Sequence, residues 1–240
     1  FEKGKKIMQR KWPNAKFIAY FQANTNTYAP LEKLKQCFEP FINRKDCIGL
    51  SIATRSDSIT DECLDYLEDI NKRTFLTIEL GLQTIHEKTS KLINRCSSLN
   101  NFETMVKKLR ERNINVVIHI INGLPYETEE MMLDTVKYLN KLDINGIKIH
   151  MLAILKNTPL EKYYQTHKFK VLTKEEYINI VVKQLEYLRP EIIIHRLTED
   201  PNPEDIIEPT WLIKKFTVLN DIDKLMSKNN IYQGDKLTKE

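Results

Sequence analysis

Residues 75–84 read Phe75-Leu-Thr-Ile-Glu-Leu-Gly-Leu-Gln-Thr84, an apolar run that ends in a glycine, an amide and a hydroxyl. A short run rich in aromatic and β-branched residues predicts a β-strand. Polar residues directly after such a strand point to its carboxyl end, where α/β folds with parallel strands hold their ligands. This stretch therefore predicts both a strand and a ligand-facing strand end.

Five further runs of the same kind occur along the chain. They are Phe17-Ile-Ala-Tyr-Phe21, Ile48-Gly-Leu-Ser-Ile52, Val116-Val-Ile-His-Ile120, Gly146-Ile-Lys-Ile-His150 and Glu191-Ile-Ile-Ile-His195. Together with residues 75–79, the first five runs in chain order recur about every 28–40 residues, which is the spacing of βαβ units. Several are apolar on both faces, as strands of a covered parallel sheet are.

Amphipathic segments separate these runs and predict helices. Thr60 precedes an acidic first turn and is the expected N-cap of its helix, and Thr173 and Glu176 have the spacing of a capping box. The expected helices cover residues 31–41, 60–70, 102–109, 132–139, 173–188 and about 210–227. The alternation favours a parallel barrel or partial barrel. A doubly wound sheet is the second possibility, because periodicity does not distinguish a closed sheet from an open one.

Bulk composition limits the class of protein. The chain has 240 residues, 41% hydrophobic and 29% charged, with a net charge of +4. This composition is that of a soluble folded domain without a transmembrane run, and we expect no membrane partner. The mildly basic net charge is compatible with binding to nucleic acid. The first residues resemble the middle of an amphipathic helix, so we expect the chain to begin partway into its natural fold.

Four cysteines occur, at positions 37, 47, 63 and 96. None forms a C-x-x-C pair, so the chain carries neither a close-spaced metal motif nor an evident disulfide framework. A reducing cytoplasm fits this usage.

Polar side chains follow several of the predicted strands. The segments are 22–28, 53–57, 79–84 and 122–125, and the fifth strand ends at His150. Some of these residues have a structural alternative. Gln83 could cap a helix, Arg95 could be a surface cation, and His119 could be a core histidine. Serine-protease, zincin, P-loop and dinucleotide-binding motifs do not occur.

At these segments the sequence resembles the radical S-adenosylmethionine (SAM) superfamily, in particular a bacterial family related to the catalytic subunit of Elongator. The strings that carry the resemblance are Tyr20-Phe-Gln-Ala-Asn-Thr-Asn-Thr-Tyr-Ala-Pro30, Gly49-Leu-Ser-Ile-Ala-Thr-Arg55, Glu79-Leu-Gly-Leu-Gln-Thr84, Lys91-Leu-Ile-Asn-Arg95, His119-Ile-Ile-Asn-Gly-Leu-Pro125, Gly146-Ile-Lys-Ile-His150 and His195-Arg-Leu-Thr198. They are long, occur in order, and span roughly residues 5 to 235.

The resemblance implies a partial parallel (β/α)6 TIM-like barrel over residues 1–155, followed by a C-terminal α/β extension over residues 156–240. It implies a [4Fe–4S] cluster that cleaves SAM, an electron donor, and hydrogen abstraction from a substrate. The SAM contacts implied are Gln22, Asn24, Thr25, Ser51, Thr54, Gln83, Arg95, His119 and Asn122. His119 stands where related enzymes carry an acidic ribose contact. The candidates on the substrate side are Lys148, His150, His195 and Arg196.

One part of the family pattern does not occur in the chain. The family's three cluster cysteines belong in a loop after the first barrel strand, and both the loop and that strand are missing. We expect these cysteines upstream of Phe1, and we expect the chain as it stands to hold no cluster, to bind SAM weakly if at all, and to be inactive. The kinship with Elongator makes tRNA a candidate substrate. The rival hypotheses are a non-catalytic RNA- or partner-binding barrel and a barrel enzyme with ordinary acid–base chemistry.

Overall fold

The computed structural model describes residues 1–22 and 24–237. Six strands form one sheet in the order β1-β2-β3-β4-β5-β7, and β6 and β8 form a separate antiparallel pair. The strands of the large sheet are β1 (Phe17–Phe21), β2 (Cys47–Thr54), β3 (Phe75–Gln83), β4 (Asn115–Asn122), β5 (Gly146–Met151) and β7 (Ile193–Arg196). The short pair consists of β6 (Ile154–Leu155) and β8 (Ile206–Glu208).

Helices follow most of the strands. They are α1 (Glu2–Gln9), α2 (Leu31–Ile42), α3 (Asp61–Arg73), α4 (Glu87–Leu92), α5 (Leu99–Glu111), α6 (Glu129–Leu139), α7 (Pro159–Thr166), α8 (Lys174–Glu186) and α9 (Lys215–Lys228). Three 3₁₀ turns complete the described part, η1 (Ser56–Ser58), η2 (Pro203–Asp205) and η3 (Thr210–Lys214). Among residues 1–22 and 24–237, no helix has both the length and the apolar character needed to cross a membrane.

The chain divides into two compact units, one of residues 1–81 with 97–117 and one of residues 82–96 with 118–240. Strands β3 and β4 contribute residues to both units. The expected boundary between residues 155 and 156 falls inside the second unit, at the end of β6.

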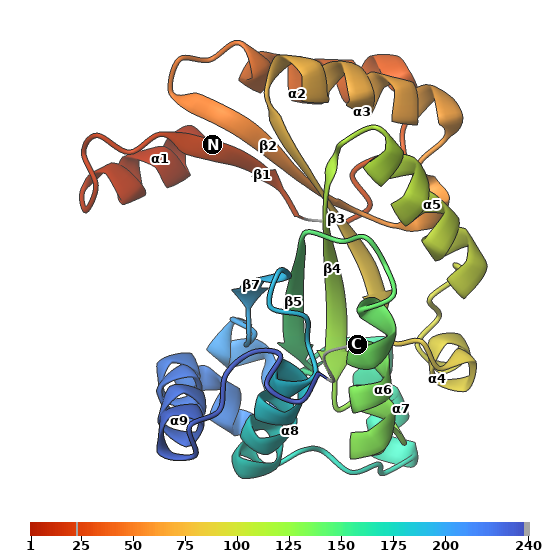
Figure 1. Ribbon diagram of the computed structural model, residues 1–240, viewed down its shortest axis with the longest axis vertical. Coiled ribbons are helices and arrows are strands. Elements are labelled where there is room, and N and C mark those ends of the chain that lie inside the picture. The colour runs from red at the N-terminus through yellow and green to blue at the C-terminus, as the bar shows by residue number, and fades with distance from the viewer. Residues whose placement is uncertain (23, 238–240) are drawn as a thin grey trace. The chain divides into compact units, whose positions relative to one another are not determined.

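In the first unit, β1 pairs with β2 and β2 with β3, both in parallel. Helices α2 and α3 lie next to each other, and α2 packs on β2 (Figure 1). Their buried faces include Leu34, Phe38, Leu64 and Leu67, and Leu50 on β2 is buried as well. Apolar burial of this kind is the main stabilising contribution, at roughly 25 cal/mol per Å² removed from water.

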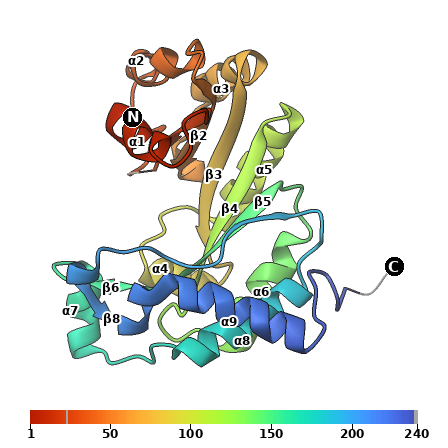
Figure 2. The ribbon, with the colours of Figure 1, turned by 90° about the vertical axis from the view of Figure 1, so that its left-hand side faces the viewer.

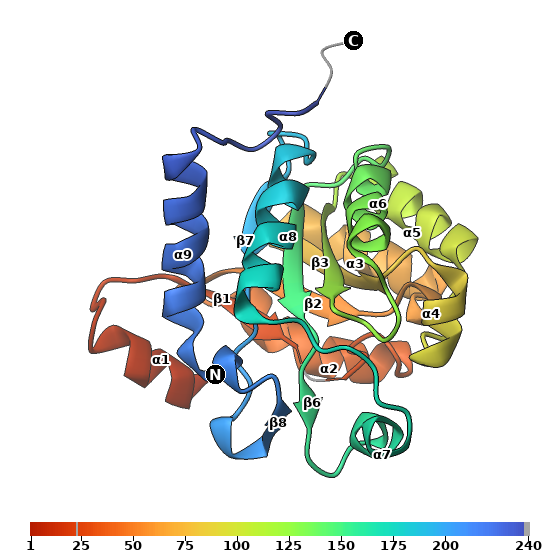
Figure 3. The same cartoon turned by 90° about the horizontal axis from the view of Figure 1, so that it is seen from below.

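In the second unit, β5 pairs with β7 in parallel. Helix α8 lies between α6 and α9 (Figure 3). The β6–β8 pair lies beside α7 (Figure 2). The strand β5 is buried along its whole length, including the charged Lys148 and the imidazole of His150. Two polar side chains on one face of a buried strand are unusual, because such groups need polar partners inside the protein.

Helix boundaries follow the local signals of the sequence. The hydroxyl of Thr60 accepts a hydrogen bond from the amide of Cys63, as expected of an N-cap. Thr173 and Glu176 form both bonds of the predicted capping box. These side chains satisfy amide groups that the first turn of a helix leaves without a partner.

The expected strands and helices are present, with two shifts. The last strand begins at Ile193 rather than Glu191, because the chain turns after Pro190 and the amide of Ile192 bonds to the carbonyl of Arg189. The last helix, expected from about residue 210, starts as the 3₁₀ turn η3 and becomes α-helical only at Lys215. Helices α4 and α7 and the β6–β8 pair were not predicted.

Candidate functional site

Glu79 is the buried acidic centre of the first unit. It lies in the middle of β3 and is only 4% exposed. Ser51 Oγ on β2 donates to one carboxylate oxygen at 2.7 Å, and Tyr20 OH on β1 donates to the other at 2.8 Å. Tyr20 and Ser51 are partners in the register of β1 and β2, so three neighbouring strands each supply one group. The predicted SAM contact Ser51 therefore belongs to a hydrogen-bonded cluster around Glu79.

Thr54 ends β2 and is buried against Thr27. Their hydroxyl oxygens are 2.6 Å apart, and Thr27 donates its proton to the carbonyl of Ser58 at 3.1 Å. Since the Thr27 proton is used there, Thr54 is the donor in the pair. The structure thus places Thr54 where it fastens the loop after β1 to the loop after β2.

Asn26 holds the loop that follows β1. Its side-chain amide donates to the carbonyl of Ala53 at 2.8 Å and to the carbonyl of Phe21 at 3.0 Å. The candidate contacts Gln22 and Asn24 are exposed on this loop, and Thr25 is half-buried. Asn24 has a positive φ of 66°, a conformation for which asparagine is better suited than most residues. Ala23, inside the predicted SAM segment 22–27, lies outside the described residues.

Gln83 and Arg95 are brought together in the second unit. Arg95 Nη1 donates to the carbonyl of Leu82 at 2.8 Å and to the carbonyl of Thr84, the two residues that flank Gln83. Gln83 has a φ of 59°, which costs a non-glycine residue on the order of 1 kcal/mol. Burial lowers the pKa of the Arg95 guanidinium. Arg95 therefore holds Gln83 in a strained conformation, as is often found at binding sites.

The loop after β3 continues into a second polar group, centred on Thr84. Its hydroxyl donates to Glu127 Oε1 at 2.6 Å and accepts from the amide of His86 at 3.1 Å. Burial is the largest influence on Glu127 and raises the pKa of its carboxyl group. His86 Nε2 lies 2.8 Å from the carbonyl of Met131. These contacts join the strand end to the start of α6.

A row of ionisable groups runs from β4 through β5 to the loop after β7. His150 Nε2 lies 3.1 Å from His119 Nδ1, and His150 Nδ1 is in contact with Glu199 Oε1. Arg196 Nη1 is 3.7 Å from the other carboxylate oxygen of Glu199. His119, His150 and Arg196, all predicted site residues, are thus brought together by Glu199. Lys148, two residues before His150, is buried beside them on β5 and pairs in register with Arg196.

His195 is not part of this row. The register of β5 and β7 shifts between Ile147 and Lys148. The His195 ring lies over Gly146, so close that a Cβ atom at Gly146 would be 2.5 Å from it. Gly146 opens β5 whereas His150 lies near its end, and four strand residues span about 13 Å. The structure therefore places His195 at the amino end of β5, away from His150.

Asn122, the last predicted SAM contact, ends β4 and is 1% exposed. Its side-chain amide pairs with that of Gln184 on α8. Among the described contacts, its side chain serves to join a strand to a helix.

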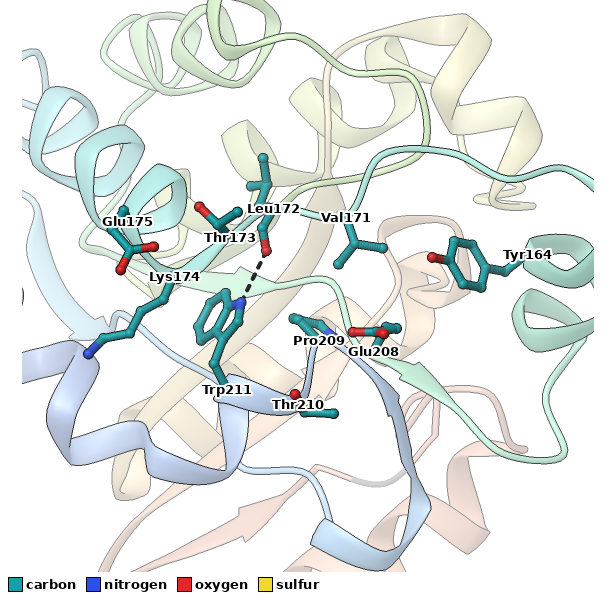
Figure 4. A pocket seen from close by; sticks show the side chains of 10 residues that line it. All are labelled: Tyr164, Val171, Leu172, Thr173, Lys174, Glu175, Glu208, Pro209, Thr210 and Trp211. Carbon is teal, nitrogen blue, oxygen red and sulfur yellow. Dashed lines mark hydrogen bonds between the residues drawn. The ribbon is translucent and has the colours of Figure 1, made fainter.

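A pocket of about 460 Å³ opens elsewhere in the second unit (Figure 4). The rings of Tyr164 and Trp211 form part of its wall, and Trp211 Nε1 donates to the carbonyl of Leu172 at 3.1 Å. The first turn of α8, with Lys174 and Glu175, borders it. None of the predicted site residues lines this pocket, so its position was not foreseen from the sequence.

The cysteines do not fit an iron–sulfur cluster. Cys47 and Cys63 are buried in β2 and α3, Cys37 is half-buried in α2, and Cys96 is exposed in a loop. In the described part of the chain, no three His, Cys, Asp or Glu side chains are placed to hold a metal ion. In each unit, taken by itself, the strand ends carry polar groups of the kind that bind an organic ligand. The first unit offers amides and hydroxyls, and the second offers an imidazole and the strained Gln83.

Glu79, Glu127 and Glu199 are acidic residues of these clusters that the sequence did not single out as site residues. The sequence suggests Glu79 as a carboxylate at a strand end, whereas it lies in the middle of β3 and its partners Tyr20 and Ser51 are 59 and 28 positions away. Glu199 lies in an irregular, proline-rich segment where periodicity carries no information.

Comparison with protein families gives two matches that together span most of the chain. The model of the radical SAM superfamily matches residues 4–139, and the model of the radical SAM C-terminal domain matches residues 144–228.

Individual relatives agree with these matches. Protein YtqA of Bacillus subtilis (strain 168) is 47% identical over 96% of this chain and 71% of its own length. The tRNA uridine(34) acetyltransferase of Methanocaldococcus infernus is 22% identical over 77% of this chain and 34% of its own.

The archaeal Methanocaldococcus infernus Elp3 with an N-terminal deletion superposes with a TM-score of 0.80. It is 18% identical and is matched over 96% of this chain and 58% of its own. At this identity the likeness shows the fold, and with the six-stranded sheet it confirms the predicted partial parallel barrel. The predicted kinship with the Elongator catalytic subunit is confirmed as well.

Proposed function

Because the chain belongs to the radical SAM superfamily, we propose that the full-length protein is an enzyme that cleaves SAM at a [4Fe–4S] cluster and abstracts hydrogen from a substrate. The observation that carries this proposal is the match of both superfamily models in order along the chain. The chain spans 71% of protein YtqA and 58% of the solved Elp3 chain, so the proposal concerns the whole protein.

The cluster ligands are assigned to cysteines outside this chain, since the four present do not converge. When bound, cluster and SAM together supply a 5′-deoxyadenosyl radical. The role of this chain is to bind and orient SAM and to keep water from it. Arg95 holds the loop that carries Gln83, and Glu79 orients Ser51.

We assign SAM contacts to the side chains predicted from the sequence that lie at strand ends. From the first unit these are Gln22, Asn24, Thr25, Ser51 and Thr54, and from the second unit Gln83, Arg95, His119 and Asn122. Lys148, His150 and Arg196 are assigned to the substrate side. His195 keeps this assignment as a weaker candidate, because it lies beside Gly146. The division into a barrel of residues 1–155 and an extension of residues 156–240 is part of the same proposal.

Transfer RNA is the substrate class that we propose. One relative is a tRNA uridine(34) acetyltransferase, and the chain is basic, with a net charge of +4. An electron donor is required to reduce the cluster. Four free thiols fit the reducing cytoplasm as the place of action.

The direct test uses full-length protein that is purified and reconstituted without oxygen. We expect a reducible [4Fe–4S] signal in electron paramagnetic resonance and formation of 5′-deoxyadenosine from SAM. Folded, iron-loaded protein that shows neither would overturn the proposal. If it instead catalyses a reaction without SAM, the acid–base alternative holds.

The RNA part is tested separately by tRNA binding at several salt concentrations. Contacts with phosphates release counterions, so we expect the affinity to fall steeply between 50 and 200 mM salt, by about tenfold or more. A salt-independent affinity would speak against an RNA substrate. Tight RNA binding by a protein without cluster chemistry would favour the non-catalytic alternative.

A further inference from the structure

Three aromatic side chains gather on the surface of the second unit, where the loop after β4 contacts α7. The hydroxyl oxygens of Tyr126 and Tyr163 lie 3.2 Å apart and join these two segments, although 37 positions separate them in the chain. The ring of Tyr163 is stacked on that of His167, with the centroids 4.4 Å apart and an interplanar angle of 6°. We call Tyr126, Tyr163 and His167 the aromatic patch.

Phe169 supports the aromatic patch from inside the protein. It is only 6% exposed, and its ring meets that of Tyr126 edge-on, with 6.2 Å between the centroids and an angle of 66°. Its centroid lies 6.4 Å from that of Tyr163. Rings that are held in place before a ligand arrives lose little conformational freedom on binding, which favours affinity. The patch is therefore a pre-organised surface.

Tyr126 is the member of the patch that packing does not account for. It is 59% exposed, and a ring that remains mostly in water gains little free energy from burial. Its φ of 65° lies in the left-handed region, which glycine and asparagine adopt more readily than tyrosine. Residues in such conformations concentrate at binding sites. Tyr126 also follows the end of β4, the side of the sheet where parallel α/β folds bind ligands.

The segment that carries α7 is basic. Residues 156–170 contain four lysines and one glutamate, which gives a net charge of +3 with histidine neutral. Lys162 and Lys168 each adjoin a residue of the aromatic patch in the chain. Both are exposed, and neither forms an ion pair within the part of the chain that the structure describes. The carboxylate of Glu161 accepts a hydrogen bond from the amide of Asn157 at 2.6 Å. Cations beside exposed rings are the combination that binds single-stranded nucleic acid.

We propose that the aromatic patch is a stacking platform for an unpaired base of an RNA ligand, and that Lys162 and Lys168 contact the neighbouring phosphates. The inference rests on the proposed function, which names RNA as the substrate class. Every base offers a flat face to an aromatic ring, whereas in a duplex adjacent base pairs cover that face. The platform therefore selects single-stranded or splayed-out nucleotides without reading their sequence. A protein partner fits less well, since lysine is depleted at protein interfaces.

Binding of RNA to the full-length protein, measured by fluorescence anisotropy, tests the platform. The probes are total tRNA, a single-stranded oligoribonucleotide of about 15 nucleotides, and the duplex that it forms with its complement. Tyr126→Asn removes the ring but suits the backbone conformation, and it should weaken binding of the single strand and of tRNA about tenfold. Tyr126→Phe keeps the ring and should retain most of the affinity. Tyr232→Asn, at a tyrosine that is 62% exposed, is the matched control and should bind as the wild type does.

Salt dependence separates the lysines from the ring. Lys162→Gln and Lys168→Gln should each make the plot of log affinity against log salt concentration less steep by about 0.7, since a phosphate contact with a single strand releases counterions. Tyr126→Asn should leave the slope unchanged, because stacking involves no counterion. Lys228→Gln, at an exposed lysine that ends α9, is the control for the loss of one charge.

Three results overturn the inference. They are equal RNA affinities of Tyr126→Asn and the wild type, an equal loss in Tyr126→Asn and Tyr126→Phe, and a loss in Tyr126→Asn that is as large with the duplex as with the single strand. Thermal unfolding of each variant identifies misfolding. If Tyr126→Asn does not fold, His167→Ala takes its place with the same expectation.

The proposed function can fail separately from the platform. Calorimetry with S-adenosylhomocysteine should give the same affinity for Tyr126→Asn and the wild type, and a loss there would assign the ring to SAM and overturn the inference. Absence of 5′-deoxyadenosine with the RNA results intact would overturn the proposed chemistry alone. A wild type that binds neither RNA would overturn both the RNA substrate and the platform, and formation of 5′-deoxyadenosine would then still support the chemistry.

Discussion

Asn122 and Gln184 exchange two side-chain hydrogen bonds, of 2.8 and 2.9 Å, although 62 positions separate them in the chain. Asn122 ends β4, Gln184 lies on α8, and both are essentially inaccessible to water. Gln184 also donates to the carbonyl of Met132 at 3.0 Å. The pair therefore connects β4 with α6 and α8 and helps to fix how these helices are oriented on the strand, which apolar packing alone specifies less closely.

Replacing one member of this pair should be costly. Gln184→Leu leaves the Asn122 amide buried without its partner, and we expect the free energy of unfolding to fall by about 2–3 kcal/mol. The double variant with Asn122→Leu should recover part of that loss, because both polar groups are then gone. Urea denaturation of the wild type, the two single variants and the double variant measures these free energies of unfolding. Gln165→Leu, at an exposed position, is the control and should change the free energy of unfolding by no more than about 0.5 kcal/mol. Additive losses in the double variant would show that the two side chains do not interact.

Gly146 should tolerate no side chain. A Cβ atom there would lie 2.5 Å from the His195 ring and 2.9 Å from the carbonyl oxygen of Ile193. We expect Gly146→Ala to cost about 1–3 kcal/mol of unfolding free energy, partly recovered by His195→Ala. Gly4→Ala on α1, where nothing lies within 4 Å, should instead be neutral or stabilising by up to about 1 kcal/mol. Equal effects at the two glycines would contradict this account.

Arg95 should matter for ligand binding through Gln83. Arg95→Lys keeps the charge but loses the guanidinium that spans the carbonyls of Leu82 and Thr84. We expect the affinity of the full-length protein for SAM to fall about tenfold or more, equivalent to roughly 1.4 kcal/mol. Isothermal titration calorimetry measures it, and Arg10→Lys at an exposed position is the control. Unchanged affinity would remove Arg95 and its loop from the SAM site.

The structural role of Ser51 and its proposed role in SAM binding can be tested separately. Ser51→Ala removes one donor to buried Glu79, and Tyr20→Phe removes another. Each should lower the unfolding free energy by about 1–2 kcal/mol. If Ser51 also contacts SAM, Ser51→Ala should weaken SAM binding by more than its loss of stability accounts for, whereas Tyr20→Phe should not. Equal affinities of the two variants would confine Ser51 to support of Glu79.

Glu127 should make stability depend on pH. Its folded pKa is raised by burial, so between its ordinary pKa and the raised value the folded state binds more protons than the unfolded state. Stability therefore falls as the pH rises through that window. We expect Glu127→Gln, which still accepts from Thr84, to show a smaller decrease in melting temperature from pH 4.5 to pH 7 than the wild type. Glu111→Gln, exposed on α5, should behave as the wild type. A steeper decrease in Glu127→Gln would reverse the assigned sign.

Secondary structure was largely readable because its causes are local. The N-cap at Thr60, the capping box of Thr173 with Glu176 and the apolar strand runs each depend on neighbours in the chain, and the structure contains all of them. The short β6–β8 pair was missed, since a strand of two or three residues has no period to detect. The last strand was misplaced by two residues because the turn after Pro190 outweighs the β propensity of Ile192.

Candidate site residues could be named from the sequence, but their hydrogen-bond partners could not. The polar strand ends and the resemblance named Gln83, Arg95, His119 and His150 from the chain alone. That Arg95 holds the two carbonyls around Gln83, and that His119 bonds to His150, depends on the folded loop and sheet. His195 and His150 were both named as candidates for the substrate side. The register shift between β5 and β7 separates them.

The sequence by itself determined the order of the six main strands and the longer helices, the parallel α/β class and the family, because periodicity, capping and motif spacing are properties of neighbouring residues. The tertiary structure decided which distant groups share a proton or a hydrogen bond: Glu79 with Ser51 and Tyr20, Asn122 with Gln184, and Glu199 with His150. Those choices depend on sheet register and helix packing. Burial then makes each pairing necessary, since a polar group removed from water must find a partner inside the protein.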